Sequence, residues 1–115
     1  MDDRSDISPF LVQEVLINAR MIDSRIKSER IDEELFSKSP FHQDLLTMPL
    51  LRICELVSNH KDAFKAINPS YPWDEVAKMR SKIAHPYGGF DFYFVWTAIV
   101  EDLPSLVSIC EDYVS

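Results

Sequence analysis

The sequence predicts an all-α fold, an up-and-down bundle of four to five helices within a single domain spanning residues 1–115. The 115-residue chain is long enough for one hydrophobic core and too short for two domains. Glycine occurs only as the pair Gly88 and Gly89, whereas most of the seven prolines stand where helices could begin. Apolar residues recur at helical spacing, and no repeat, low-complexity tract or linker divides the chain.

The first half of the chain predicts two long helices. The first should begin at Ser8 and Pro9, a capping serine followed by a proline in the first turn. Its apolar stripe consists of Leu11, Val12, Val15, Leu16, Ala19, Ile22 and Ile26. The charged residues 27–34 should form a connection. A second helical region covers roughly residues 41–60, in which Pro49 must either start the main segment or kink it. The apolar side of that region contains Leu46, Leu50, Ile53, Cys54 and Val57.

The third helix should start at residues 71–73, Tyr-Pro-Trp, and end near His85 because Pro86 pushes the preceding residue out of helical geometry. Acidic residues stand in its first turn and basic residues in its last turns, as the helix dipole favours. Asp91 can cap a fourth helix over residues 92–101, whose run Phe-Tyr-Phe-Val-Trp is apolar on every side and could equally be a strand. Its surroundings favour a helix buried in the core or an interface. A last amphipathic helix is marked by Leu103, Leu106, Val107, Cys110 and Val114.

Composition narrows the class of function. The acidic start of the chain is unlike a secretory signal peptide, and the longest apolar run, residues 92–100, is about half of the roughly 20 residues that span a bilayer. We therefore expect a cytoplasmic protein without a membrane partner. Cys54 and Cys110 stand among apolar neighbours and are expected to be buried thiols. Two cysteines and three scattered histidines are too few for a zinc site, so no metal or other cofactor is expected.

Charge is unevenly distributed along the chain. The net charge of −7 argues against non-specific binding to a polyanion. Residues 88–115 carry five acidic side chains and no basic one, and residues 1–59 are also net acidic. Residues 60–87 carry five basic and three acidic side chains. This net-positive segment also contains the residues best suited to chemistry.

Three residues near the end of the third helix stand out. On a helical wheel Arg80 falls near the centre of an apolar stripe that includes Trp73, where an arginine is costly unless something pairs with it. It could form an ion pair, for example with Glu55, or extend its long stem to solvent. His85 could cap the helix end, and Tyr87 could cover the core. Taken singly, each residue has an ordinary structural explanation.

Together, residues 80–87 read R-x-x-x-x-H-x-Y, and here the chain resembles a known family. With this motif the chain is similar to the HepT-like ribonucleases of the HEPN superfamily, toxins of bacterial and archaeal toxin–antitoxin pairs. The likeness covers about residues 45–110 and extends to the surroundings of the motif. These comprise Arg52, Glu55, Pro72, Trp73, Met79, Gly89, Phe90, Asp91, Trp96 and residues 102–104. Ser81 departs from the asparagine that many relatives carry there, and Ser58-Asn59 replaces a common Gly-Glu.

The resemblance implies a HEPN-like homodimer that cleaves RNA without metal, in the manner of a type VII-like toxin. Arg80 and His85 of two subunits would form the catalytic site, with Ser81 and Tyr87 in supporting roles. Histidine titrates near neutral pH and can act as acid or base, and arginine binds phosphate oxygens in a planar fork. The apolar surface around Trp73 or the run 92–96 could supply the dimer interface. The partner implied is a cognate minimal nucleotidyltransferase antitoxin, which would modify Tyr87 with AMP.

Other functions remain open at this point. The chain could be a non-catalytic helical bundle that partners a nucleotidyltransferase as a substrate-binding or adaptor subunit. It could also be an unrelated dimeric helical adaptor. Growth arrest on expression, lost on changing His85, would favour the ribonuclease over both.

Overall fold

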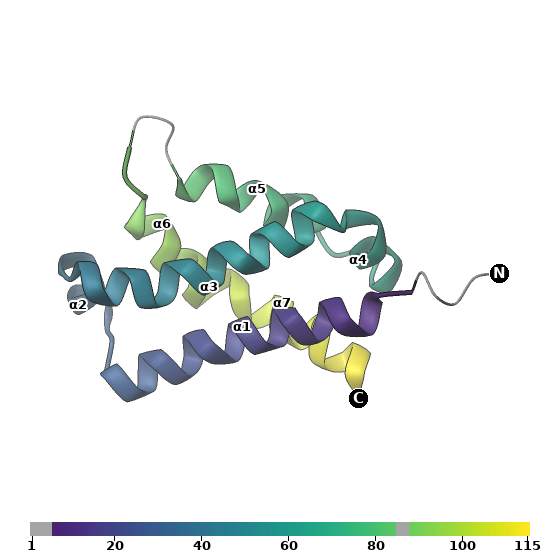
Figure 1. The fold of residues 1–115 in the computed structure, drawn as a ribbon, viewed down its shortest axis with the longest axis horizontal. Coiled ribbons are helices and arrows are strands. Elements are labelled where there is room, and N and C mark those ends of the chain that lie inside the picture. Colours follow the sequence, from purple (N-terminus) through teal and green to yellow (C-terminus); the bar gives the residue numbers. More distant parts are fainter. Residues whose placement is uncertain (1–5, 85–87) are drawn as a thin grey trace.

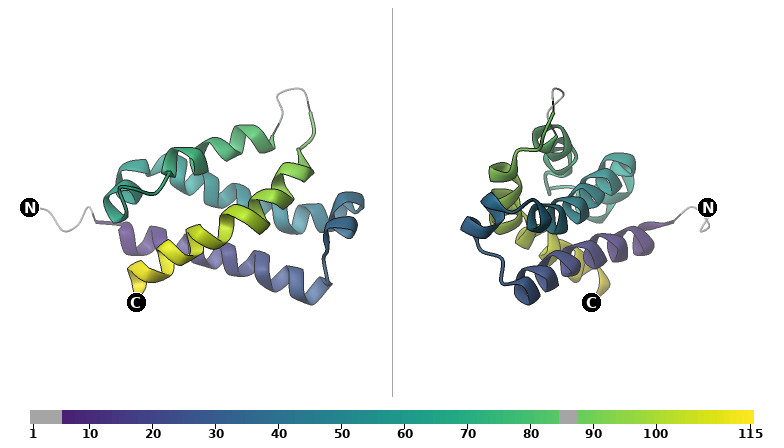
Figure 2. Two further views of the ribbon diagram at one scale, coloured as in Figure 1. Left: turned by 180° about the vertical axis from the view of Figure 1, so that it is seen from behind. Right: turned by 60° about the vertical axis from the view of Figure 1, so that its left-hand side comes forward.

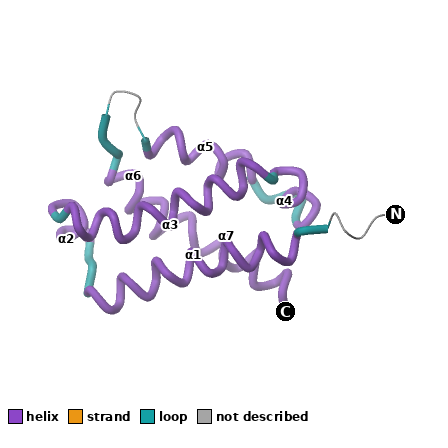
Figure 3. Tube along the Cα trace, in the orientation of Figure 1, coloured by secondary structure: helices purple, strands orange, loops and turns teal. Residues whose placement is uncertain are grey.

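The computed structural model describes residues 6–84 and 88–115, and their regular structure is helical. The elements are α1 (Ser8–Glu29), α2 (Glu33–Lys38), α3 (Pro40–Asn59), α4 (Lys61–Ile67), α5 (Trp73–Ile83), α6 (Phe92–Thr97), the π-helical turn η2 (Ala98–Asp102) and α7 (Leu103–Val114). Short loops join most of them (Figure 3). The predicted all-α class is confirmed.

The long helices lie side by side along the molecule. In Figure 1, α3 lies between α1 and α5, with the short helices α2 and α4 at opposite ends. Seen from behind, the chain from α6 to α7 crosses the bundle obliquely (Figure 2). The helix α7 packs against α1, and α6 contacts α2, α3 and α5. This arrangement leaves one side of α5 at the surface.

The core is formed by the stripes that the sequence indicates. On α1 the buried residues include Leu11, Val12, Val15, Leu16, Ala19 and Ile22, and on α3 they include Leu46, Leu50, Ile53, Cys54 and Val57. Each large aliphatic side chain buried in this way contributes about 1.5–3 kcal/mol relative to its exposed state. Both cysteines are free and buried, as expected. Burial raises the pKa of the Cys54 thiol to about 12 and that of Cys110 to about 11.

Two expectations about α1 are wrong in detail. The N-cap residue is Ile7 rather than Ser8, and the Asp6 carboxylate accepts a hydrogen bond from the Ser8 N–H at 3.1 Å. The charged residues 27–34 also do not all belong to a loop between helices. The helix α1 continues to Glu29, after which Arg30 adopts a left-handed conformation with φ of 53°, and α2 already begins at Glu33.

Pro49 lies inside a continuous helix. The helix α3 begins at Pro40 and runs through Pro49, so Pro49 does not start the main segment. Proline has no N–H to donate to the carbonyl four residues earlier, which is that of Leu45. The Arg25 guanidinium of α1 donates a hydrogen bond to this oxygen at 2.7 Å. The replacement donor also ties α1 to the middle of α3.

The two helices predicted after Asp91 are one. Residues Phe92–Val114 form a continuous helix whose middle part, η2, is π-helical. Within the described residues, this helix alone is long and apolar enough to cross a membrane by length and composition, a criterion that a buried core helix also meets. Glu101 and Asp102 are exposed near its centre, where charge is costly in a bilayer.

Candidate functional site

The start of α5 is fixed by aromatic packing and hydrogen bonds. The ring centroid of Trp73 lies 4.9 Å from that of Phe64 on α4, and its indole N–H donates to the Asn68 carbonyl at 2.8 Å. In the first turn, Asp74 accepts a hydrogen bond from Lys65 at 3.4 Å and lies 3.6 Å from Lys61. The Lys65 hydrogen bond and charge, with a smaller effect of Lys61, lower the pKa of Asp74. Both ends of α4 are thereby tied to α5.

Arg80 does not lie at the centre of the buried face, contrary to the wheel. Its side chain is 59% exposed, whereas Trp73, Val76 and Ile83 are buried. The helical wheel placed Arg80 at the centre of the apolar stripe because it counted Ala77 and Ala84 as core residues. Both are only partly buried, so the centre of the buried face lies away from Arg80. The face that packs against α3 is centred on Val76 and Ile83. Arg80 therefore lies at the edge of the contact between α5 and α3, where a phosphate can reach it.

At this edge Arg80 forms an ion pair with Glu55, the partner that the sequence suggested. Its Nη1 lies 3.9 Å from Oε2 of Glu55 on α3, and both side chains are more than half exposed. A pair of this kind stabilises a fold by about 1 kcal/mol or less. The contact holds the guanidinium near α3 without burying it, so Arg80 can exchange this carboxylate for another anion.

The remaining predicted site residues fall into two groups. Ser81 is exposed, and its hydroxyl donates to the Lys78 carbonyl at 2.9 Å within α5. His85 and Tyr87 lie outside the described residues. On either side of residues 85–87, Ala84 and Phe90 form an antiparallel bridge, and the Asp91 N–H donates to the Ile83 carbonyl at 2.8 Å. These contacts hold the residues that flank 85–87 next to each other, at the end of α5 that carries Arg80.

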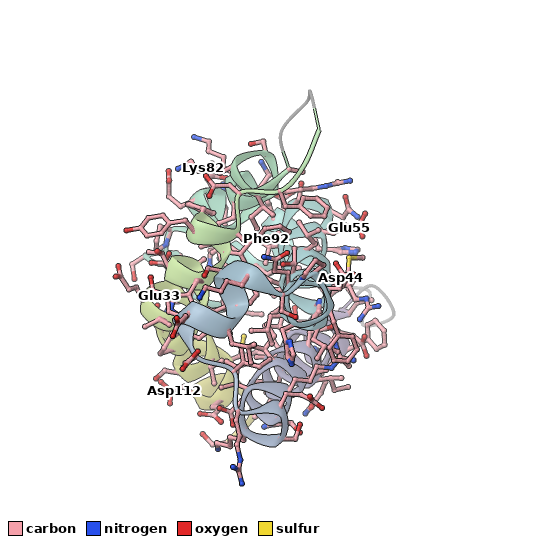
Figure 4. The ribbon with its side chains drawn as sticks, turned by 90° about the vertical axis from the view of Figure 1, so that its left-hand side faces the viewer. Glu33, Asp44, Glu55, Lys82, Phe92 and Asp112 are labelled. Carbon is pink, nitrogen blue, oxygen red and sulfur yellow. The ribbon has the colours of Figure 1, made fainter. Side chains whose placement is uncertain are left out.

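The exposed face of α5 carries two further cations that sequence reasoning did not assign to the site. Lys78 is exposed and lies 4.0 Å from Glu75 of the same helix. The Lys82 ammonium lies 6.0 Å from the ring centroid of Phe94 on α6. Figure 4 shows Lys82 and Glu55 on opposite sides of the end of the molecule that carries the α5–α6 connection. The basic residues of α5 thus lie on a surface bordered by α3 on one side and α6 on the other, whereas Lys61 and Lys65 of the positive segment lie on α4 beside Asp74.

The sequence of the chain matches a known protein family. The family described as Ribonuclease HepT-like matches residues 15–113 of the chain. The chain belongs to this family. The match begins inside α1 and continues almost to the end of α7, so it extends beyond residues 45–110, over which the sequence showed the resemblance. Membership supports a ribonuclease function and RNA as the class of substrate.

Individual HepT-like relatives agree with the family. The chain is 43% identical over 54 residues to the "Probable ribonuclease HepT" of Thermococcus cleftensis, an alignment that covers 47% of this chain and 49% of the relative, about half of its length. It is 31% identical over 98 residues to a candidate RNase of Caldanaerobacter subterraneus subsp. tengcongensis, covering 85% of each chain. A candidate RNase of Methanocaldococcus jannaschii is 26% identical over 111 residues, which are 96% of this chain and 89% of that protein. No solved structure matches the chain significantly.

Two other features of this HepT-like chain bear on its chemistry. A groove of about 480 Å³ lies between α1 and the helix η2–α7, and Arg80, Ser81 and Glu55 are not among its lining residues. Within residues 6–84 and 88–115, no three histidine, cysteine, aspartate or glutamate side chains are placed to hold a metal ion. Among the described residues, Lys78, Arg80, Ser81 and Lys82 near the end of α5 are exposed.

Proposed function

We propose that this HepT-like protein is a metal-independent RNA endonuclease in which Arg80 and His85 are the catalytic residues. The observation that carries the proposal is the exposure of Arg80 at the end of α5, five residues before His85, in a chain of this ribonuclease family. An arginine at the centre of the core would be out of reach of RNA. An arginine that is 59% exposed, and whose ion pair within the described residues is with the exposed carboxylate of Glu55, is available to a phosphate.

The reaction needs a base, an acid and a fixed cation. One His85 imidazole takes the proton of the RNA 2′-hydroxyl as its oxygen forms a bond to the adjacent phosphorus. The bond between phosphorus and the 5′-oxygen breaks, and a protonated imidazole supplies the proton that this oxygen takes up. Arg80 offsets the charge that grows on the phosphate oxygens. The products are a 2′,3′-cyclic phosphate and a free 5′-hydroxyl.

We propose that the site is completed by a second copy of the chain, because one motif supplies a single imidazole for two proton transfers. Two chains related by a twofold axis bring together two arginines and two histidines. Trp73 cannot form the interface, since it is 1% exposed, and most of the run 92–96 is half-buried or buried. Phe41 and Met48 are exposed on α3 at seven-residue intervals before Glu55, so all three share one side of that helix. This α3 stripe leads to Arg80 and is the proposed interface.

Physiologically, we propose a cytoplasmic toxin that a cognate minimal nucleotidyltransferase holds inactive. Tyr87, two residues from His85, is the proposed site of AMP transfer. Each AMP would add bulk and about one negative charge beside a site that binds phosphate, which repels RNA without unfolding the protein. Mass spectrometry of the peptide containing Tyr87, after coexpression with the nucleotidyltransferase, tests this. Neutralisation with an unmodified peptide would mean that inhibition occurs by binding.

The catalytic proposal is tested with purified variants. Arg80→Ala and His85→Ala should abolish cleavage and leave the circular dichroism of the protein unchanged, and a chelator should have little effect. Arg20→Ala, which removes an exposed arginine from α1, is the matched control and should cleave normally. Full activity of His85→Ala would overturn the proposal. Products with 5′-phosphate ends would point instead to a metal-activated water.

A further inference from the structure

We infer that the exposed face of α5 is a track for single-stranded RNA, which runs from Arg80 across Lys78 and Lys82 to a base-stacking platform at Tyr93. This inference rests on the proposed ribonuclease function and extends it by assigning a binding subsite outside the motif. The platform stands at the first turn of α6, on the opposite border of α5 from Glu55. Its ligand is the nucleobase of a nucleotide that flanks the cleaved bond.

The cations form a continuous path across α5. Around the helix axis Arg80 comes first, beside α3, followed by Ser81, Lys78 and Lys82, at intervals of about 40–100°. Lys78 and Lys82 are exposed, and the Lys82 ammonium lies toward α6, 6.0 Å from the Phe94 ring centroid. A helix with its side chains is about 10–12 Å wide, a distance that a few nucleotides of extended RNA cross. The first turn of α5 carries Asp74 and Glu75, so the cations that meet the phosphates of a single strand are confined to its last two turns, and the net charge of −7 opposes RNA binding over the surface as a whole.

The aromatic end of the track is exposed but firmly supported. Tyr93 is 76% exposed, the most exposed large aromatic side chain among the described residues. The Asp91 carboxylate caps α6 by accepting from the Phe94 N–H at 2.9 Å. Phe92 packs edge-on against Phe36 of α2, at 5.9 Å between ring centroids, and Phe90 packs on Phe92 at 6.0 Å. The neighbours of Tyr93 are therefore anchored while its own ring is left to solvent.

Tyr93 precedes Phe94, whose ring faces the Lys82 ammonium. An exposed aromatic ring together with nearby lysine is the chemistry that holds single strands. Every base has a face that can stack on an aromatic ring, and lysine neutralises the accompanying phosphate. The bridge between Ala84 and Phe90 joins the end of α5 to the residues just before α6, so the first turn of α6, which carries Tyr93, lies close to the end of α5. Tyr93 in this position binds substrate and takes no part in the bond-breaking step.

The test is binding of an eight-nucleotide single-stranded RNA, and of an abasic ribose-phosphate chain of equal length, to the uncleaving His85→Ala protein by fluorescence anisotropy. Tyr93→Leu should weaken RNA binding about tenfold and leave abasic binding unchanged, because only stacking is lost. Tyr93→Phe should retain the affinity. Lys82→Gln should weaken both ligands alike and reduce the salt dependence. Phe10→Leu, at a site 62% exposed at the start of α1, is the matched control.

Equal loss of both ligands in Tyr93→Leu, or no loss, would overturn the inference. A change in molecular mass of Tyr93→Leu by light scattering would also overturn it, since Tyr93 would then belong to a contact between copies. The proposed catalysis is judged separately, with intact His85. If that protein cleaves RNA while Tyr93→Leu binds normally, only the platform fails; if it does not cleave but the base-dependent loss is seen, the platform stands and the nuclease fails.

Discussion

At the scale of single residues, the contact between Arg80 and Glu55 decides how the site meets its substrate. The two side chains face each other at 3.9 Å at the edge of the α5–α3 contact, and both are more than half exposed. A phosphate that binds Arg80 must compete with the Glu55 carboxylate. Under the proposed function, we expect Glu55 to lower the affinity of Arg80 for RNA while it keeps the guanidinium near α3.

We predict that Glu55→Gln increases RNA affinity by up to about fivefold, the equivalent of an exposed ion pair worth about 1 kcal/mol. The free energy of unfolding should change by less than about 1 kcal/mol for the same reason. Anisotropy at constant salt and urea denaturation measure the two quantities. Glu33→Gln, which removes one exposed carboxylate from α2, controls for net charge (Figure 4). Weaker binding by Glu55→Gln would contradict this prediction and show that Glu55 orients Arg80 productively.

The candidate site residues could be proposed from the sequence, but their environment could not be predicted. Arg80 stood out on the helical wheel as an arginine within an apolar stripe, and the motif that it forms with His85 and Tyr87 gave the resemblance to the HepT-like ribonucleases. Its exposure could not be found in the same way. The helical wheel describes one helix, whereas the neighbours of α5 determine which of its residues are buried. Lys82 was not assigned to the site because its position beside Phe94 depends on α6 packing against α5. The exposure of Tyr93, within an apolar run of the sequence, likewise depends on how α6 packs.

At the scale of elements, the long helices could be predicted and the short ones could not. The helices α1 and α3 each repeat the apolar spacing over 20 or more residues, so the pattern is unmistakable. The helices α2 and α4 have six and seven residues, too few for a periodicity. Each buries a single phenylalanine, Phe36 or Phe64. Asp32, whose side chain accepts from the Leu35 N–H at 2.8 Å, was the available local signal for α2.

The connection between α5 and α6 depends on its two glycines. Gly88 and Gly89 have φ values of 112° and 71°, and a Cβ added to either would meet no atom within 4 Å. Any cost of substitution is therefore backbone strain. Gly89→Ala should lower the free energy of unfolding by about 1–2 kcal/mol, the cost of a left-handed residue with a side chain. Gly88→Ala should cost more, because its φ lies well outside the left-handed helical region near 57°.

Urea denaturation measures these costs, with Gly89→Asn as the control, because asparagine tolerates the left-handed conformation better than alanine. Gly89→Asn should therefore be more stable than Gly89→Ala. RNA cleavage should fall in Gly88→Ala even under conditions where the protein is fully folded, since the segment 84–90 carries His85. Equal stability of all three variants with the parent would contradict the strain seen at these positions.

At the scale of the whole molecule, the proposed reaction calls for an assembly. The net charge of −7 opposes binding of RNA to the surface in general, so we expect RNA to bind at the exposed cations of α5. One copy of the motif supplies a single imidazole for the two proton transfers of the proposed reaction, and a second copy would supply the other. The exposed α3 stripe of Phe41 and Met48 lies next to the exposed face of α5 and gives a second copy a place to pack.

We therefore predict a homodimer at micromolar concentration, measured by light scattering. Met48→Glu should yield a monomer without cleavage activity, because it places charge in the proposed interface. Ile17→Glu is the matched control, since Ile17 is about as exposed on α1, at 48% against 44% for Met48. Mixing the parent protein with an excess of the Arg80→Ala/His85→Ala double variant should reduce cleavage more than dilution does, because a mixed dimer holds a single imidazole for the two proton transfers. A monomeric protein that cleaves RNA at the parental rate would refute the composite site while leaving the roles of Arg80 and His85 within one chain.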